Sequence, residues 1–218
     1  MNKKSIKILI YPILSSALVI LTGVYLGKYL LLSGLTKLFY SIILTNIALV
    51  TPLIFTKSRI VFLSGIKGFK NINKLTLISK TIAYYILFNI LTVLLTIILK
   101  KIGFLTNIFQ EQVGIINLLK QFEDYKIILI IFIGLLGPTL EELYFRNFIM
   151  EFLKKVFNFK IAILAQALLF GLLHGEIQSL GFVVIWGLYL GVIREKHNIY
   201  YSIALHSLVN TVSFIFLF

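Results

Sequence analysis

The sequence contains no cysteine and few charged residues. Only 13% of its 218 residues are charged, and 8 acidic residues stand against 21 basic ones. The absence of cysteine excludes a disulfide scaffold as well as thiolate nucleophiles and thiolate metal ligands. Soluble domains carry about 25% charged residues, so the low charge argues against an ordinary soluble domain. The chain is instead apolar, with 59% hydrophobic residues and a mean hydropathy of +0.99, which is the composition of a membrane protein.

Apolar runs of membrane-spanning length recur along the chain. A helix needs about 20 mainly apolar residues to cross the hydrocarbon core. Such runs, the fifth and sixth of them short, lie at 6–26, 38–55, 81–99, 127–149, 159–175, 179–193 and 200–218. They predict an all-α, polytopic membrane helical bundle of about seven transmembrane helices, within a range of about six to eight. The first run lacks a convincing small-residue cleavage site, so we expect an uncleaved span rather than a signal peptide.

The basic residues are grouped in short loops between the apolar runs. Alternate loops hold 14 and 6 Lys and Arg residues, and the richer set includes 6 in the segment 56–80. The positive-inside rule then predicts a multi-pass protein of the cell membrane with its N-terminus in the cytoplasm. Such scattered clusters predict contacts with anionic lipid headgroups and no nucleic-acid partner. Segment 56–80 is expected either to lie on the inner leaflet as an amphipathic stretch or to form a plain basic loop.

The chain shows no recognisable repeat, low-complexity tract or domain linker. We therefore expect a single integral membrane domain over residues 1–218. All the unusual polar residues follow residue 135. The catalytic part is accordingly predicted at about 127–218, with the N-terminal half as a scaffold.

The segment GLLGPTLEELYFRNFIM, residues 134–150, carries two acids and a base within an apolar run. A lone charge at mid-membrane costs about 2.5–3.5 kcal/mol on insertion scales, so such a residue is usually paired or lines a cavity. Glu142 and Arg146 are four residues apart and share a helix face, which predicts an ion pair that supports helix packing. Glu141 is turned about 100° away from Glu142 and is left without a partner on its own helix.

The same segment contains residues that weaken a helix. Gly134, Gly137 and Pro138 lie just before the two acids. Proline lacks an N–H group and disrupts the hydrogen bond to an earlier carbonyl. We therefore expect a thinned and kinked helix with free backbone carbonyls and space beside the acids, although such residues also occur in ordinary membrane helices.

Two histidines lie in apolar runs. In FGLLH, His174 follows Phe170 by four residues, and in HSLVN, His206 precedes Asn210 by four, so each pair shares a helix face. A lone buried histidine is more often a packed core residue than a ligand. Two of them, with a same-face asparagine and an unpartnered glutamate, favour a functional site. The third histidine, His197, falls in the loop sequence REKHN and is expected to be solvated.

An acid, two imidazoles and a carboxamide provide the chemistry of peptide hydrolysis. Glu141 can take a proton from a water molecule while an imidazole or the Asn210 amide stabilises the oxyanion. Alternatively, His174 and His206 with Glu141 or Asn210 can hold a divalent metal such as zinc, which activates the water. The sequence leaves both mechanisms open, so the cofactor is either none or one such metal. The HExxH motif of zinc proteases and the GxSxG elbow of serine hydrolases do not occur.

Three motifs in this order resemble those of the CAAX protease and bacteriocin-processing family, also called Abi, which includes the type II prenyl-protein endopeptidases. They are EELYFR at 141–146, FGLLH at 170–174 and HSLVN at 206–210. The family shows EExxxR, FxxxH and HxxxN or HxxxD on separate membrane helices. The resemblance covers roughly residues 135–215, and the first 130 residues carry none of its motifs.

The resemblance implies roles for individual residues. Glu141 corresponds to the water-activating base, and His174, His206 and Asn210 complete the catalytic site. Glu142 and Arg146 are implied to be supporting residues, as their spacing also indicates. Phe170 is interpreted as a packing residue beside His174. Both a metalloprotease and a metal-free glutamate mechanism are associated with the family.

The function implied by the resemblance is an intramembrane endopeptidase that acts on a membrane-associated peptide or protein. Eukaryotic relatives cut prenylated C-terminal tails, whereas many bacterial members are linked to peptide pheromone or bacteriocin processing or to self-immunity. A compact chain rich in Ile, Lys, Phe and Asn is typical of an AT-rich bacterium and favours the second group. Two other hypotheses are a non-catalytic membrane immunity protein that sequesters a bacteriocin or its receptor, and a small transporter or proton relay. No inverted repeat supports the transporter.

The position of His174 conflicts with this simple topology. Glu141 and His206 fall in the cytoplasmic halves of their helices, whereas His174 lies about 15 residues into an outward-running helix, or over about 20 Å along it. The helix 159–175 must therefore start late, tilt strongly or break, or the number of spans must differ.

Overall fold

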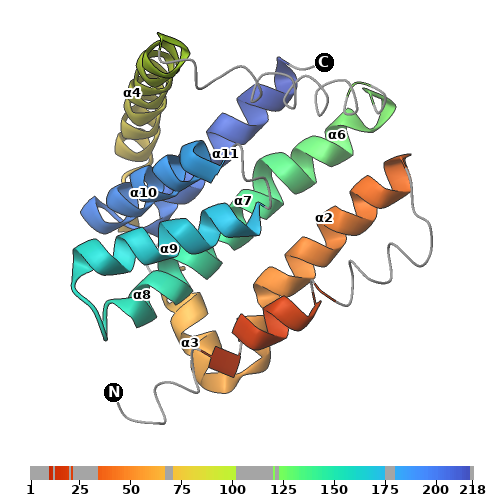
Figure 1. Cartoon of the computed structure of the whole chain (residues 1–218), viewed down its shortest axis with the longest axis vertical. Coiled ribbons are helices and arrows are strands. Elements are labelled where there is room, and N and C mark those ends of the chain that lie inside the picture. Colours follow the sequence, from red (N-terminus) through yellow and green to blue (C-terminus); the bar gives the residue numbers. More distant parts are fainter. Residues whose placement is uncertain are drawn as a thin grey trace.

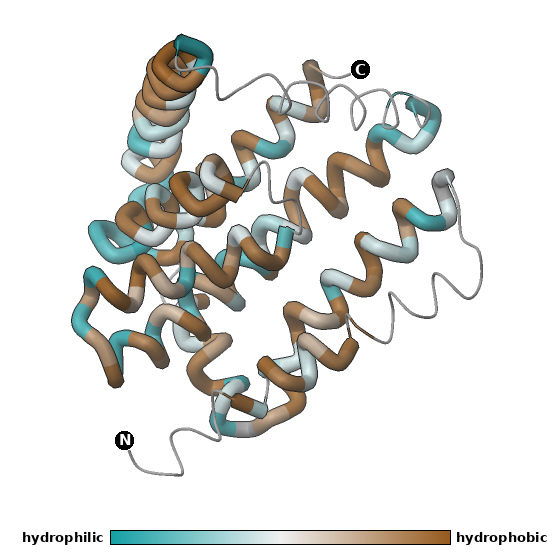
Figure 2. Tube along the Cα trace, viewed as in Figure 1, coloured by the Kyte–Doolittle hydropathy of each residue, from teal (hydrophilic) through white to brown (hydrophobic). Residues whose placement is uncertain are grey.

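The computed structural model describes residues 10–11, 13–19, 21, 34–66, 71–101, 120, 123–174 and 180–216. No strand occurs among these residues, and the helices pack into a bundle, which confirms the all-α prediction (Figure 1). Within the same residues, three helices are long and apolar enough to cross a membrane, at Thr36–Ile54, Lys74–Lys101 and Glu123–Leu153. Apolar residues follow the lengths of the helices, and hydrophilic ones gather near their ends (Figure 2). The chain is therefore a membrane protein, while the number of its spans stays a prediction.

The helices overlap the predicted apolar runs, except α3, which lies in the basic segment 56–80. They are α2 (Gly34–Val50), η1 (Thr51–Ile54), α3 (Thr56–Ser64), α4 (Lys74–Lys101), α9 (Phe159–Leu173), α10 (Leu180–Lys196) and α11 (Ile199–Ile215). Between α4 and α9, one long helical segment comprises η3 (Glu123–Tyr125), α6 (Lys126–Leu129), η4 (Ile130–Leu136), α7 (Gly137–Glu141), η5 (Glu142–Ile149) and α8 (Met150–Leu153). Both η4 and η5 are π-helical. Most of the predicted run 6–26 lies outside the described residues, although 10–11, 13–19 and 21 are helical.

Asparagines begin three of the helices. The Oδ1 atoms of Asn73, Asn158 and Asn198 accept backbone N–H groups at the starts of α4, α9 and α11, at 3.0–3.1 Å. Such a cap satisfies one of the N–H groups that the first helical turn leaves free, and its loss typically costs about 1 kcal/mol. Each cap follows or lies near a basic stretch of the sequence, so these residues mark where the chain re-enters the apolar bundle.

Helices α9 and α10 form a closely packed pair. Gly187 and Gly191 of α10 face Ala167 and Ile163 of α9, so closely that a Cβ on either glycine would lie about 3 Å from them. Small residues allow helix backbones to approach in this way, as is common in membrane bundles. The side chain of the buried Gln166 donates to the Gly187 carbonyl at 3.0 Å and adds a polar link between the two helices. Helix α11 packs in turn against α10, α4, α7 and η4 and so occupies the centre of the bundle (Figure 1).

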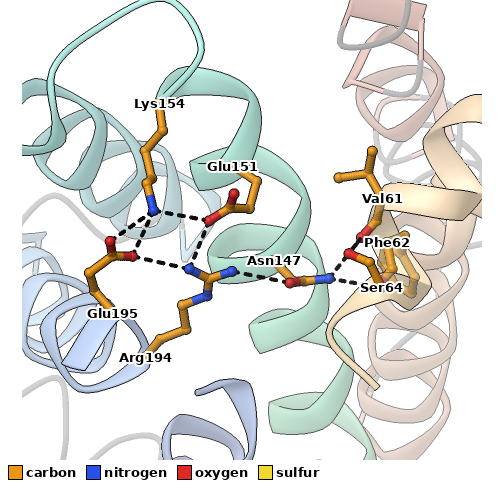
Figure 3. Close-up of polar contacts among 8 residues, drawn as sticks. All are labelled: Val61, Phe62, Ser64, Asn147, Glu151, Lys154, Arg194 and Glu195. Carbon is orange, nitrogen blue, oxygen red and sulfur yellow. Dashed lines mark hydrogen bonds and ion pairs between the residues drawn. The ribbon is translucent and has the colours of Figure 1, made fainter. Parts of the chain in front are cut away.

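Helix α3 is held against the end of the bundle. It packs on η1 and η5, with Phe62 buried. Asn147 of η5 donates from Nδ2 to the carbonyls of Val61 and Phe62 at 2.8 and 2.9 Å (Figure 3). The plain loop that the sequence allowed for the segment 56–80 is therefore wrong for residues 56–64, because this stretch forms a helix with a buried face and tertiary hydrogen bonds.

A polar cluster continues from Asn147 toward α8 and α10 (Figure 3). The Arg194 guanidinium lies 2.7 Å from a Glu151 oxygen and 3.4 Å from Asn147 Oδ1. Lys154 Nζ lies 2.8 Å from Glu195. Together with the bonds of Asn147 to α3, these contacts join three segments that are far apart in the sequence, namely α3, residues 147–154 and the end of α10. They fix the end of the segment that carries Glu141, Glu142 and Arg146.

The turn between α10 and α11 contains His197. Its Nε2 lies 2.7 Å from the Tyr84 hydroxyl of α4, and its ring packs 4.6 Å from that of Tyr201. The side chain is half-buried. The expectation that this loop histidine is simply solvated is therefore wrong, because α4 and α11 bring two tyrosines onto it.

Candidate active site

A buried ionic cluster lies at the junction of η5 and α11. The Glu142 carboxylate oxygen Oε1 is 3.0 Å from Arg146 Nη1 and 2.9 Å from His206 Nδ1. The side chains of Glu142 and Arg146 are both 0% exposed. The ion pair predicted from the four-residue spacing is thus present, and it has a third member, His206, that spacing within one helix could not reveal.

Phe170 of α9 covers this cluster. The Arg146 guanidinium carbon lies 4.1 Å from the centre of the Phe170 ring, the geometry of a cation–π contact. The centre of the same ring lies 4.5 Å from the centre of the His174 ring and 6.0 Å from that of the His206 ring. Phe170 is fully buried. Phe170 therefore packs beside His174, as predicted, and its ring also contacts Arg146 and His206.

The contact with Glu142 fixes the orientation of His206. An ionised carboxylate can only accept hydrogen bonds, so Nδ1 of His206 carries a proton and donates a hydrogen bond to Glu142. Nε2 then points to the other acid, and it lies 3.8 Å from Oε2 of Glu141. This distance is too long for a direct hydrogen bond between the His206 ring and Glu141.

Glu141 differs from its neighbour in its surroundings. Its side chain is 17% exposed, whereas that of Glu142 is 0% exposed. The Oε2 atom is buried and makes no direct hydrogen bond to the described residues. The predicted contrast between the two acids therefore holds in the structure: Glu142 is bound by Arg146 and His206, and Glu141 faces a cavity, with the His206 ring across the gap of 3.8 Å.

Asn210 is positioned by the disrupted helix beside it. Its Nδ2 donates to the Ile133 carbonyl at 3.0 Å, and Thr211 Oγ1 donates to the Gly134 carbonyl at 3.4 Å. Pro138 has no N–H group, so it cannot bond the carbonyl five residues earlier, as in a π-helix, or four residues earlier, as in an α-helix. Those two carbonyls belong to Ile133 and Gly134. The sequence expectation that proline frees carbonyls is confirmed, and α11 satisfies them.

Glu141, His174, His206 and Asn210 all line one cavity of about 540 Å³. This volume lies within the range of about 300–1,000 Å³ that is typical of ligand sites. Of the explanations for the position of His174, a late start is excluded, since α9 begins at Phe159 and His174 caps its C-terminal end. Figure 1 shows α9 inclined to the long segment that contains α7. This inclination brings the end of α9 to the cavity.

The cavity has further lining residues that the sequence did not single out. Trp186 of α10 packs against His206, with ring centres 5.6 Å apart. Ser41, Thr45 and Asn46 come from α2, in the part of the chain predicted to be only a scaffold. A signal for these three was present, because they are polar residues within the apolar run 38–55 and Ser41 and Thr45 share a helix face.

The metal suggested as an alternative would need ligands from His174, His206, Glu141 or Asn210. Among the described residues, no group of three or more His, Cys, Asp and Glu side chains could hold a metal ion. His206 Nδ1 bonds Glu142 and His174 Nδ1 bonds the Phe170 carbonyl at 2.8 Å, which leaves only Nε2 of each ring as a candidate ligand atom. The arrangement of these side chains does not fit the metal.

Comparison with protein families identifies the region that holds this site. Residues 123–212 match the family model described as type II CAAX prenyl endopeptidase Rce1-like. Over this segment, the chain is similar to the Rce1-like family. The segment contains every candidate residue from Glu141 to Asn210, whereas the lining residues of α2 lie outside it. Members of this family are intramembrane proteases, so the match supports protease activity in general terms. No curated protein and no solved structure matches the chain.

Proposed function

We propose that this Rce1-like protein is an intramembrane endopeptidase in which Glu141 activates a water molecule. The observation that carries the proposal is the contrast between the two adjacent acids. Glu142 is fully buried and bound by Arg146 and His206, while Glu141 lines the cavity and its Oε2 has no hydrogen-bond partner among the described residues. A general base needs a carboxylate that can receive a proton and can reach water, and of these two acids Glu141 meets both requirements.

The remaining polar residues supply what the attack on a peptide carbonyl requires. Glu141 takes a proton from water, whose oxygen bonds to the carbonyl carbon and produces an oxyanion. His174, His206 and Asn210 line the same cavity. Asn210 keeps a second N–H for that oxyanion, and each histidine can offer Nε2–H in its imidazolium form. Collapse of the tetrahedral intermediate breaks the C–N bond, and the proton held by Glu141 passes to the leaving amine.

We propose a membrane-associated peptide or protein as the substrate, with a bacterial role in peptide pheromone or bacteriocin processing or self-immunity. The apolar residues of the cavity, among them Phe132, Val183 and Trp186, support an apolar peptide segment. The composition of the chain supports a bacterial origin. Such a substrate reaches the site from within or near the bilayer.

We further propose a multi-pass topology with the N-terminus in the cytoplasm and with anionic lipid headgroups beside the basic end of the bundle. Lys57 and Arg59 are exposed on α3, and α3 is bonded to η5 near Lys154 and Arg194. These basic residues lie together at one end of the bundle, which supports the orientation that the positive-inside rule predicts. Because the chain has no cysteine, a Lys57→Cys variant gives a single thiol. An impermeant thiol reagent added outside cells should leave it unlabelled until the membrane is opened.

The central experiment compares cleavage of a panel of membrane-associated peptides by the wild type and by Glu141→Gln. Loss of the base should lower kcat by roughly 10²–10⁴-fold. The exposed Glu123, whose side chain is 63% exposed, provides a matched Glu→Gln control that should retain full activity. Equal activity of Glu141→Gln and wild type would remove Glu141 from the chemistry. Assays with and without chelator then distinguish a metal-dependent mechanism from the metal-free one.

The alternative hypothesis of a non-catalytic immunity protein makes the opposite prediction. A Glu141→Gln protein that is folded and still protects cells from a bacteriocin would favour sequestration over cleavage. Folding is checked by the circular dichroism spectrum and by the elution volume in detergent.

A further inference from the structure

Helix α2 gives the cavity a second polar wall. Ser41, Thr45 and Asn46 line the cavity from α2, and Glu141, His206 and Asn210 line it from α7 and α11. Helix α2 also packs against α7. Any peptide in this cavity therefore has α2 beside it as well as the candidate catalytic groups.

The side-chain amide of Asn46 uses one N–H donor of Nδ2, whereas its oxygen acceptor has no partner among the described residues. Nδ2 donates to the Ile42 carbonyl of the same helix at 2.8 Å. The Oδ1 atom is buried and has no hydrogen-bond partner among the described residues. A buried acceptor without a partner is unfavourable, and such an atom in a native structure calls for a partner that binds there.

Asn89 makes the same bond to the carbonyl four residues earlier, yet its side chain is exposed. This bond therefore does not by itself explain why the oxygen of Asn46 is buried. Nδ2 of Asn89 donates to the Tyr85 carbonyl at the same distance of 2.8 Å, and its side chain is exposed on α4. Asn46 makes this bond on the cavity side of α2 instead. The two asparagines have the same local bond and differ in burial, because Oδ1 of Asn46 is buried and the side chain of Asn89 is exposed.

An extended peptide would bring the group that Asn46 lacks. Each of its residues other than proline carries a backbone N–H donor, and inside a membrane that donor must find an acceptor in the protein. The terminal torsion of asparagine is soft, so Oδ1 can turn toward a bound peptide without changing the χ1 rotamer. The carboxylate of Glu141 would remain available for water.

We propose that Asn46 is a substrate-binding residue whose Oδ1 accepts a backbone N–H of the peptide beside the scissile bond. This inference rests on the proposed peptidase function and adds to it a binding group from α2. Asn46 holds and aligns the peptide, and it takes no part in proton transfer.

The test uses peptide binding to the Glu141→Gln protein, so that binding is measured without cleavage. The probe is a peptide that the wild type cleaves, carrying a fluorophore and reconstituted with the protein in phosphatidylcholine bicelles. Replacing Asn46 by Leu, which removes the acceptor at similar size, should weaken binding by about three- to tenfold, the effect of one neutral hydrogen bond. The matched change Asn89→Leu should leave binding unchanged.

A second measurement identifies the hydrogen bond itself. Peptides methylated at one backbone nitrogen at a time lose one donor each. One such peptide should bind the Glu141→Gln protein more weakly than the parent, and this penalty should vanish in Glu141→Gln/Asn46→Leu. If Asn46→Leu fails to fold, Asn46→Ala serves in its place. A merely structural role would weaken binding of all the peptides alike, and that result overturns the proposal.

The outcomes separate this proposal from the proposed function. If the wild type cleaves peptide and Asn46→Leu binds it as well as Asn89→Leu does, only the role of Asn46 is wrong. If Glu141→Gln and wild type bind no peptide and cleave none, both proposals fail. In the wild-type background, Asn46→Leu should raise KM with little change in kcat.

Discussion

Removing the cation from the buried cluster should destabilise the protein strongly. In Arg146→Met, the Glu142 carboxylate remains at 0% exposure without the guanidinium that now lies 3.0 Å away. Breaking a buried ion pair from one side costs about 3–5 kcal/mol, because the other charge is left uncompensated. The lost contact of the guanidinium with the Phe170 ring, at 4.1 Å, adds up to about 2 kcal/mol in a desolvated site. We therefore expect a loss of at least about 3 kcal/mol in the free energy of unfolding.

Two companion variants test the reasoning behind this number. In Glu142→Gln/Arg146→Met the stranded charge is gone and the introduced amide oxygen can still accept from His206, so the double variant should be more stable than Arg146→Met alone. Lys126→Met breaks an exposed pair in which the side chains of Lys126 and Glu123 are 49% and 63% exposed, and it should cost at most about 0.5 kcal/mol.

The assay is denaturant unfolding in mixed micelles, followed by circular dichroism for all four proteins. If Arg146→Met is as stable as Lys126→Met, the buried pair contributes nothing and the reasoning is refuted. A double variant less stable than Arg146→Met would show instead that the loss comes from packing rather than from the stranded carboxylate.

Two further predictions concern the α9–α10 pair and the turn that follows it. Gly191→Ala places a Cβ 2.9 Å from Ile163 Cγ1 and should lower the free energy of unfolding by about 1–3 kcal/mol. Its control is Gly181→Ala, which has no atom within 4 Å of the new Cβ and should be neutral or stabilising. Equal unfolding free energies of the two variants would contradict the close packing. Burial, followed by the charges of Lys80 and Lys196, lowers the pKa of His197 from its ordinary 6.5. As the pH falls, the unfolded chain therefore takes up this proton before the folded chain does, so the free energy of unfolding should decrease below about pH 6.5. In unfolding measured across this pH range, His197→Gln should make that decrease smaller. An equal decrease in both proteins would show that His197 titrates alike in the folded and unfolded states.

The parts of the site that follow from local rules could be predicted from the sequence. The pairing of Glu142 with Arg146 depends only on a spacing of four residues, and the structure shows it at 3.0 Å. The free carbonyls before the acids depend only on the missing N–H group of Pro138, and Asn210 and Thr211 accordingly bond them. Both effects act within one helical segment, where the geometry is set by the backbone.

The parts that depend on packing between helices could not be predicted. Asn46 and Asn89 both lie in apolar runs and both bond the carbonyl four residues earlier, so the sequence treats them alike. Only the packing of α2 against α7 places Asn46 at the cavity and leaves Asn89 exposed on α4. The same holds for His197, because its tyrosine partner at position 84 belongs to another helix.

The two adjacent acids can be understood as parts of one proton-holding unit. The site has two carboxylates and, among the described residues, one arginine in contact with them, so it is one positive charge short of neutrality unless a proton resides on His206 or Glu141. Arg146 lies 3.0 Å from Glu142 and compensates its charge, Glu142 orients His206 through Nδ1, and His206 then presents Nε2 to Glu141 at 3.8 Å. By orienting His206, the ion pair of Glu142 and Arg146 therefore determines where the proton of the proposed base Glu141 can lie. For this reason Glu142→Gln should alter the pH profile of cleavage as well as stability, and its effect on cleavage should not add to that of Glu141→Gln.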